Sequence, residues 1–198
     1  MGTMLARLDV ETRAFHVSTD GVWRELTGRA ATPATYMHQL VRVYGFEAPL
    51  EAALAYTPGI AAVLDVRGRV RSGLIARDLL ALGISAANIA ELPQCMIAPF
   101  ASAGEALGWM YVLERAALLH DPVRRHLIAR FPQLADATAY LAAGTDARWN
   151  EFADALEPYV STRALQQQVL GGARDAFRCA LDWFGGREAL PRRRSLTG

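Results

Sequence analysis

Hydrophobic positions recur along most of this chain at intervals of three and four residues, which is the period of an amphipathic α-helix. The first such segment runs from Leu5 to about Leu26. The positions predicted to face inward along it are Leu8, Thr12, Phe15, Thr19, Val22 and Leu26. Alternating β-branched runs bounded by hairpin turns, which predict strands, do not occur, so the pattern predicts an all-α fold.

Start and stop signals divide the next part of the chain into further helices. In "ATPATYMHQLVRVYGF" Thr32 can cap a helix whose first position is Pro33, and this helix should end near "TPG", with a bend expected at Gly45. A third helix fits Ser72–Leu82 with Gly83 as its terminator. The stretch "ISAANIAELPQ" then predicts one short helical turn.

In the second half of the sequence, Ser102 and Glu105 have the S-x-x-E spacing of a capping box, which begins a helix through "ALGWMYVLERAALLH". Pro122 should kink or break this helix. The remaining helical segments are "QLADATAYLAAG", "DARWNEFADALEPYV" and "TRALQQQVLGGARDAFRCALDWFGG", the last predicted to be capped by Ser161. The count is seven or eight helices, and the glycine pair in "LGGARD" is typical of a close helix crossing.

Length and composition favour one domain. The chain has 198 residues, of which 52% are hydrophobic and 21% are charged, as in soluble globular proteins. We predict a single helical domain over residues 1–186, followed by a basic, flexible tail over residues 187–198. The sequence shows no signal-peptide pattern, and none of its apolar runs approaches the roughly 20 residues needed to span a bilayer. No membrane association is therefore expected.

Charge and cysteine content exclude several functions. The 21 basic and 20 acidic residues leave a net charge of +1, which provides no field for nucleic acid. All 21 basic residues are arginine, so no lysine can form a Schiff base or complete a P-loop. Cys95 and Cys179 are far apart and outside any C-x-x-C motif, which predicts two buried thiols in a reducing compartment, and a cytoplasmic protein.

One histidine stands out as a candidate for metal chemistry. His16 lies beside the apolar stripe of the first helix, and Asp20 follows one helical turn later on the same side. A metal-bound imidazole commonly donates its second N–H to a carboxylate, so Asp20 could orient His16. The alternative is a boundary histidine paired with a surface acid, and the spacing alone does not decide between the two.

Other catalytic motifs find no support. His38, His120 and His126 do not lie in an H-E-x-x-H motif or three residues after a glutamate, which disfavours a zinc or di-iron site made by protein ligands alone. The sequence also lacks G-x-S-x-G and G-x-G-x-x-G, the signatures of acyl transfer on an α/β-hydrolase fold and of dinucleotide binding.

Five stretches between Leu8 and about Trp183 carry a resemblance to a known family: "LDVETRAFHVSTD", "YMHQLVRVYGFEAPLEAAL", "ALGWMYVLE", "RWNEFADAL" and "GARDAFRCALDWF". They resemble stretches of the haem oxygenases, most closely the bacterial enzymes that accompany bacteriophytochromes. The first is similar to the family's proximal-helix signature, and the third resembles the Gly-x-x-Tyr-Val-Leu-Glu opening of its distal helix. The fold implied is a haem-oxygenase-like helical bundle.

The resemblance implies that haem is clamped between two helices and opened with O₂ to biliverdin, CO and Fe²⁺. His16 takes the position of the proximal iron ligand, and Asp20 stands where the family usually has glutamate. Arg13 and Arg148 are implied to hold haem propionates, although ordinary solvated charges are the alternative, more so for Arg148. Electrons would come from a separate reductase or ferredoxin, and a bacteriophytochrome would receive the biliverdin in the nearest relatives.

The sequence departs from the family on the distal helix. Relatives continue Tyr-Val-Leu-Glu with Gly-Ser-x-Leu-Gly-Gly, whereas this chain places Arg115, Leu119 and His120 at the glycine positions. These residues and Tyr111 are expected to line the haem, and any Cβ there narrows the space for O₂. His120 could supply a second axial ligand, or a kink near Pro122 could carry it away.

Three functions remain open at this point. The first is a haem oxygenase; the second is a haem-binding carrier or sensor without ring opening; the third is a bundle that has lost haem and binds another apolar ligand or a partner helix.

Overall fold

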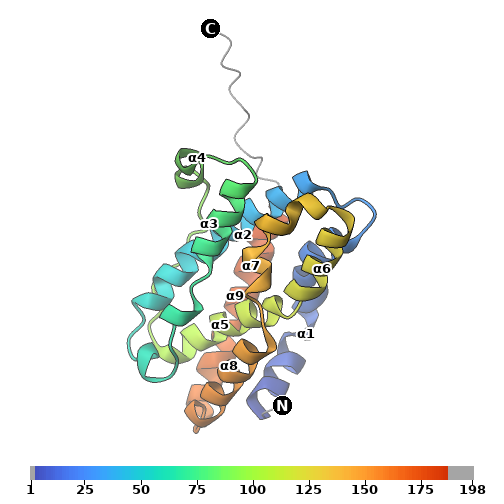
Figure 1. Cartoon of the computed structure of the whole chain (residues 1–198). Helices are drawn as coiled ribbons and strands as arrows, with labels where there is room; N and C mark the ends of the chain where they lie inside the picture. Colours follow the sequence, from blue (N-terminus) through green and yellow to red (C-terminus); the bar gives the residue numbers. More distant parts are fainter. Residues whose placement is uncertain (1–2, 187–198) are drawn as a thin grey trace.

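The computed structural model describes residues 3–186, and within them the chain forms nine α-helices and no strand (Figure 1). The helices are α1 (Thr3–Arg24), α2 (Pro33–Ala55), α3 (Ser72–Ala81), α4 (Ala86–Ala90), α5 (Ala103–Ala117), α6 (His120–Arg130), α7 (Ala139–Ala142), α8 (Asp146–Tyr159) and α9 (Arg163–Gly185). The predicted all-α fold is confirmed. The count exceeds the prediction because α6 is a separate helix, where the sequence predicted one helix kinked or broken near Pro122. The predicted tail, 187–198, lies outside the described residues.

Local signals place most helix ends where the sequence predicts them. The Thr32 side chain caps α2 in a reciprocal pair with Thr35, and the Ser102 hydroxyl accepts a hydrogen bond from the Glu105 N–H at the start of α5. Thr162 rather than Ser161 caps α9, so that prediction is wrong by one residue. Either hydroxyl could serve chemically, and the helix begins one residue later than the pattern suggests.

The break predicted near Pro122 occurs slightly earlier. Helix α5 ends at Ala117 and α6 begins at His120, which puts Pro122 in the first turn of α6, where its missing N–H costs nothing. The segment predicted to begin as one helix at Ser102 is therefore two helices with a corner at Leu118 and Leu119.

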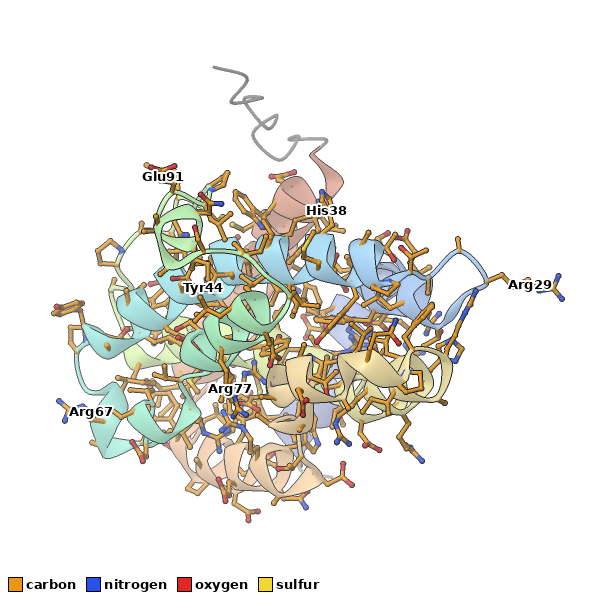
Figure 2. The ribbon with its side chains drawn as sticks, turned by 45° about the horizontal axis from the view of Figure 1, so that its top comes forward. Arg29, His38, Tyr44, Arg67, Arg77 and Glu91 are labelled. Carbon is orange, nitrogen blue, oxygen red and sulfur yellow. The ribbon has the colours of Figure 1, made fainter. Side chains whose placement is uncertain are left out.

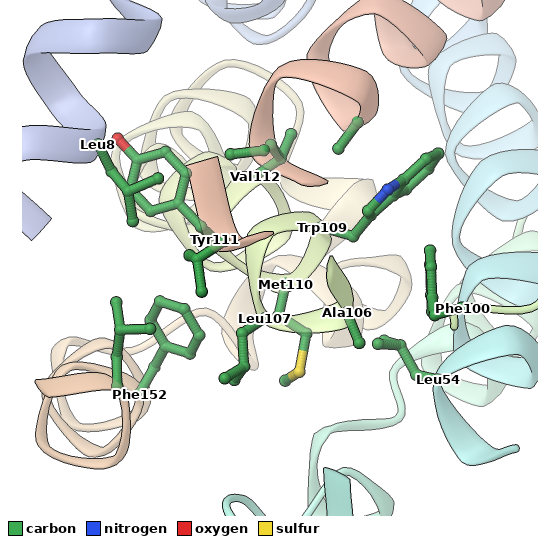
Figure 3. Close-up of a cluster of buried hydrophobic side chains, with 14 of the residues drawn as sticks. Leu8, Leu54, Phe100, Ala106, Leu107, Trp109, Met110, Tyr111, Val112 and Phe152 are labelled. Carbon is green, nitrogen blue, oxygen red and sulfur yellow. The ribbon is translucent and has the colours of Figure 1, made fainter. Parts of the chain in front are cut away.

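Helix α5 forms the centre of the bundle. Its side chains are buried on every side, as in a helix that is surrounded by others, and Figure 3 shows Leu107, Trp109, Met110, Tyr111 and Val112 pointing outward from it in different directions. The neighbours that receive them come from α1, α2, α8 and α9. A second cluster of buried hydrophobic residues lies among α2, α3, α6 and α7.

The buried stripe of α1 differs from the predicted one. Phe15, Thr19 and Val22 are only partly buried, whereas His16 and Asp20 lie on the buried face. That face reads Met4, Leu5, Leu8, Thr12, His16, Asp20 and Trp23. The two polar residues therefore point into the bundle, not to its boundary, because α5 and α9 cover this side of α1.

Glycine allows two helix backbones to touch where α5 crosses α9. A Cβ at Gly172 would overlap the carbonyl oxygen of Glu105, and one at Gly108 would overlap backbone atoms of Val169 and Ala173. The expectation that "LGGARD" marks a helix crossing is confirmed. Gly171, the neighbouring glycine, faces open space.

We therefore expect Gly172→Ala to destabilise the fold by about 1–3 kcal/mol, because the added methyl meets fixed backbone atoms, not a mobile side chain. Gly171→Ala is the matched control and should instead stabilise the helix by roughly 0.5–1 kcal/mol. Urea unfolding followed by circular dichroism measures both. Equal effects of the two substitutions would contradict the crossing.

The predicted bend at Gly45 is absent, since α2 continues without interruption from Pro33 to Ala55. The glycine has another role there. The segment before α5 passes so close that a Cβ at Gly45 would overlap the Pro93 carbonyl oxygen and lie 2.7 Å from the Trp183 ring. Gly45 thus lets the segment between α4 and α5 and the end of α9 both pack against α2.

Candidate functional site

His16 lies in the interface between α1 and the helices that cover it. The residue is 8% exposed, and its ring packs at 5.5 Å from the ring of Phe177 on α9. Its Nε2 atom lies 3.0 Å from the Thr12 hydroxyl, and its Nδ1 atom lies 3.7 Å from a carboxylate oxygen of Asp9. We call these four residues, Asp9, Thr12, His16 and Phe177, the His16 cluster.

The surroundings of His16 keep its imidazole neutral. Burial lowers the pKa of His16, the charge of Arg115 lowers it further, and the carboxylates of Asp9 and Asp20 act in the opposite direction. Neutral imidazole is the form that binds a metal ion. His16 therefore has the protonation state that an iron ligand needs at neutral pH.

Asp20 has a different partner from the predicted one. Its carboxylate accepts two hydrogen bonds from the Arg115 guanidinium, at 2.6 and 3.0 Å, and Arg24 lies 3.8 Å away. This ion pair joins α1 to α5, and both side chains are largely buried. The structure thus brings Asp20 to Arg115 and not to the imidazole, whose nearest carboxylate is that of Asp9.

Tyr111 faces the cluster from α5. The residue is 1% exposed, its ring meets Phe177 edge-on at 6.3 Å, and Figure 3 shows its hydroxyl directed toward α1 beside Leu8. Burial raises the pKa of Tyr111 to about 12, so the phenol stays protonated and can donate a hydrogen bond. Tyr111 and Arg115, both predicted to line the haem, thus lie on the helix that covers the buried face of α1.

The two arginines predicted to meet propionates differ in their availability. The Arg13 side chain is 70% exposed and pairs loosely with Asp9 at 3.4 Å. Arg148 donates instead to the carbonyl oxygens of Gly68 and Arg69, at 3.1 and 3.0 Å, and lies 3.5 Å from Glu114. Arg13 is free to reach an anionic ligand beside α1, whereas Arg148 holds the loop before α3.

His120 and Leu119 lie away from His16. The corner between α5 and α6 carries the His120 ring between Trp23 and Tyr140, at 4.8 and 4.7 Å, and Leu119 packs in the same second cluster. His120 is fully buried, and neither ring nitrogen has a hydrogen-bond partner among the described residues. This arrangement gives no support to His120 as a second axial ligand.

The burial of His120 predicts a dependence of stability on pH. Burial places its folded-state pKa well below the unfolded value of about 6.5, and the charge of Arg71 adds to this shift. The unfolded chain therefore binds a proton that the folded chain rejects, so stability is retained above pH 6.5 and falls as the pH drops below it.

Below pH 6.5 the free energy of unfolding of His120→Leu should fall less steeply than that of the wild type, by up to about 1.4 kcal/mol per pH unit. The measurement is urea unfolding of both proteins at pH 8, 7, 6 and 5. Their difference in unfolding free energy should be constant between pH 8 and 7 and should shift in favour of the variant below. Parallel curves throughout would show that His120 does not titrate as an isolated buried group.

The packing sets a condition for binding a large planar ligand at His16. The cavity between α1 and α5, lined by Thr19, Val22, Trp23, Leu113 and residues of α2 and α9, holds about 50 Å³. That is room for one or two water molecules. The donors around His16 suit haem chemically, but a macrocycle needs far more room than this space offers. Its entry between α1 and α5 would have to break the Asp20–Arg115 ion pair that joins them.

Three members of the His16 cluster were missed by the sequence reasoning. Thr12 and Asp9 precede His16 by four and seven residues, so the helical period places them on its face, and that signal was available. Phe177 lies on α9, far along the sequence, and no local pattern identifies it as a neighbour of His16.

The family described as "Heme oxygenase" matches residues 3–185, so the chain belongs to the haem oxygenase family. Among solved structures, the NO- and CO-bound haem oxygenase of Neisseria meningitidis matches with 21% identity over 98% of each chain and a TM-score of 0.70. At that identity the likeness establishes the fold. No curated protein matches the chain. The family predicted from the motifs is confirmed.

Among residues 3–186, no helix is long and apolar enough to cross a bilayer.

Proposed function

We propose that this protein binds haem through His16 and, with O₂ and electrons from a separate reductase or ferredoxin, opens the ring to biliverdin, CO and Fe²⁺. The observation that carries the proposal is the neutral, buried imidazole on α1 of a haem oxygenase chain, facing Tyr111 and Arg115 of α5. The oxidation belongs to haem itself, which supplies the iron that activates O₂ when it is bound.

The chain's own residues would position the haem and exclude water. His16 would hold the iron through Nε2. This nitrogen contacts the Thr12 hydroxyl, and the iron would take the place of that contact. Arg13 would meet a propionate at the exposed edge, where a guanidinium pairs well with a carboxylate. Asp9 is better placed than Asp20 to accept the second N–H of the imidazole, which raises the basicity of the ligand.

A second candidate function is a haem carrier or sensor without ring opening. It is favoured by the α5–α6 corner, where Arg115, Leu119 and His120 stand at the family's glycine positions and the space beside α1 holds only about 50 Å³. A cytoplasmic location, expected from the cysteine pattern, is part of the proposal, as is delivery of biliverdin to a bacteriophytochrome, which rests on the resemblance to bacterial relatives.

Titration of the full chain with haemin tests the proposal. A Soret band that saturates at one haemin per chain is expected, and ascorbate or a reductase in air should then convert it to the absorption of biliverdin, with release of CO. Saturable binding without ring opening would select the carrier, and the absence of a stoichiometric band would exclude both haem functions.

A further inference from the structure

Two cysteines separated by 84 positions in the sequence lie side by side in the structure. Cys95 lies in the segment between α4 and α5, Cys179 lies on α9, and their sulfur atoms are 3.4 Å apart. The predicted burial is confirmed for Cys95, and Cys179 is partly buried. The sequence spacing gave no indication that the two thiols are neighbours.

The backbone on both sides of this pair is held in place. The Cys95 N–H donates to the Gly45 carbonyl oxygen at 2.7 Å, and the Trp183 indole, one turn after Cys179, donates to the Arg42 carbonyl oxygen at 2.9 Å. Both cysteine-bearing segments are therefore fixed to α2. A disulfide needs about 2.05 Å between sulfur atoms, so the pair must close by roughly 1.3 Å, which rotation of the two side chains can supply.

Small reagents can reach the sulfur atoms. Both cysteines line a cavity of about 670 Å³ that is also bordered by His38, Met96 and Trp183. Figure 2 shows His38 on α2 beside the last turns of α9, at the surface of the molecule. The cavity shares no lining residue with the small space between α1 and α5, and His16 does not line it.

We propose that Cys95 and Cys179 form a redox-active dithiol, a modification site that closes to an intramolecular disulfide in the presence of a small disulfide such as oxidised glutathione. The Cys179 thiolate attacks one glutathione sulfur, the glutathione S–S bond breaks, and one glutathione thiolate leaves. The Cys95 thiolate then attacks the Cys179 sulfur and expels the second glutathione. Two protein thiols are oxidised, one glutathione disulfide is reduced to two thiols, and the protons balance.

The order of attack follows from the surroundings of each sulfur. Burial, together with the contact to Cys179, raises the pKa of Cys95 to about 12, so Cys95 is a poor first nucleophile. The contribution from Cys179 disappears once that sulfur is capped by glutathione, which makes Cys95 easier to ionise in the second step. Cys179, more exposed, reacts first.

The disulfide would tie the segment that leads into α5 to the middle of α9. It would close a loop of about the same length as the 84-residue separation, and longer loops lose more freedom in the unfolded chain when they are closed. The oxidised protein should therefore unfold at a higher urea concentration than the reduced protein. The proposal is independent of haem binding.

The test equilibrates the full chain in glutathione buffers of increasing oxidised fraction, quenches with acid, alkylates the free thiols and analyses the peptides by mass spectrometry. Wild type should lose both thiols together and yield one peptide pair joined through Cys95 and Cys179. Reduction should restore both thiols.

Two variants make the result specific. Cys95→Ser should accumulate a mixed disulfide on Cys179, and Cys179→Ser should leave Cys95 largely unmodified. Both thiols remaining free at every ratio, or a stable glutathione adduct on Cys179 of the wild type, would overturn the proposal. Circular dichroism of each variant confirms that the fold is retained.

Discussion

Replacement of His16 by alanine is expected to abolish iron ligation while the helical fold survives. Loss of residues that only support a metal ligand already costs 10–100-fold in affinity, so loss of the ligand itself should weaken haemin binding by more than about 100-fold. The Soret band of a histidine-ligated haem should disappear. The substitution also leaves a small cavity beside Phe177, and added imidazole should enter it and restore the band in part.

His38→Ala is the matched control, because His38 borders the cavity of about 670 Å³ and could hold haemin there. It should leave the spectrum of the haemin-loaded protein unchanged. A band that survives in His16→Ala and vanishes in His38→Ala would place haem in the cavity that His38 borders and would rule out His16 as the ligand. Circular dichroism and urea unfolding show whether either variant has lost its fold.

Features encoded within a few residues of sequence were predicted well. The capping pairs at Thr32 and Ser102 are local, and the crossing glycines follow from the smallness of the residues in "LGGARD". The predictions that were wrong concern features that depend on contacts between distant segments. Which face of α1 is buried is decided by α5 and α9, so the stripe through His16 and Asp20 could not be read from the period alone.

The partners of the candidate site show the same limit. Helical spacing correctly placed Asp20 on the face of His16, but its carboxylate binds Arg115, which lies 95 residues later. A bidentate ion pair with a guanidinium is stronger than a single hydrogen bond to a neutral imidazole, so the Asp20 carboxylate pairs with the distant Arg115. The proximity of Cys95 and Cys179 also arises only when α2 brings two segments together.

The Asp20–Arg115 ion pair leads to the last prediction, which concerns access of haem to His16. The pair spans the boundary between α1 and α5, where a macrocycle would have to enter, and it must break before the helices separate. Hydrogen bonds between charged groups contribute about 1.5–3 kcal/mol. Since 1.4 kcal/mol corresponds to a factor of ten, Asp20→Asn should raise haemin affinity by roughly 10–100-fold and speed association.

Asp20→Asn keeps the size of the side chain and leaves Arg115 free to meet a propionate. Asp175→Asn serves as the control, because Asp175 forms an exposed ion pair with Arg178 on α9, and its loss should change neither affinity nor rate. Stopped-flow measurement of the Soret change gives the association rate, and equilibrium titration gives the affinity. Weaker binding by Asp20→Asn would mean that Asp20 leaves Arg115 when haem binds and supports the His16 ligand, as the sequence alone suggested. Tighter binding would identify the ion pair as a contact that holds α1 against α5 until haem enters.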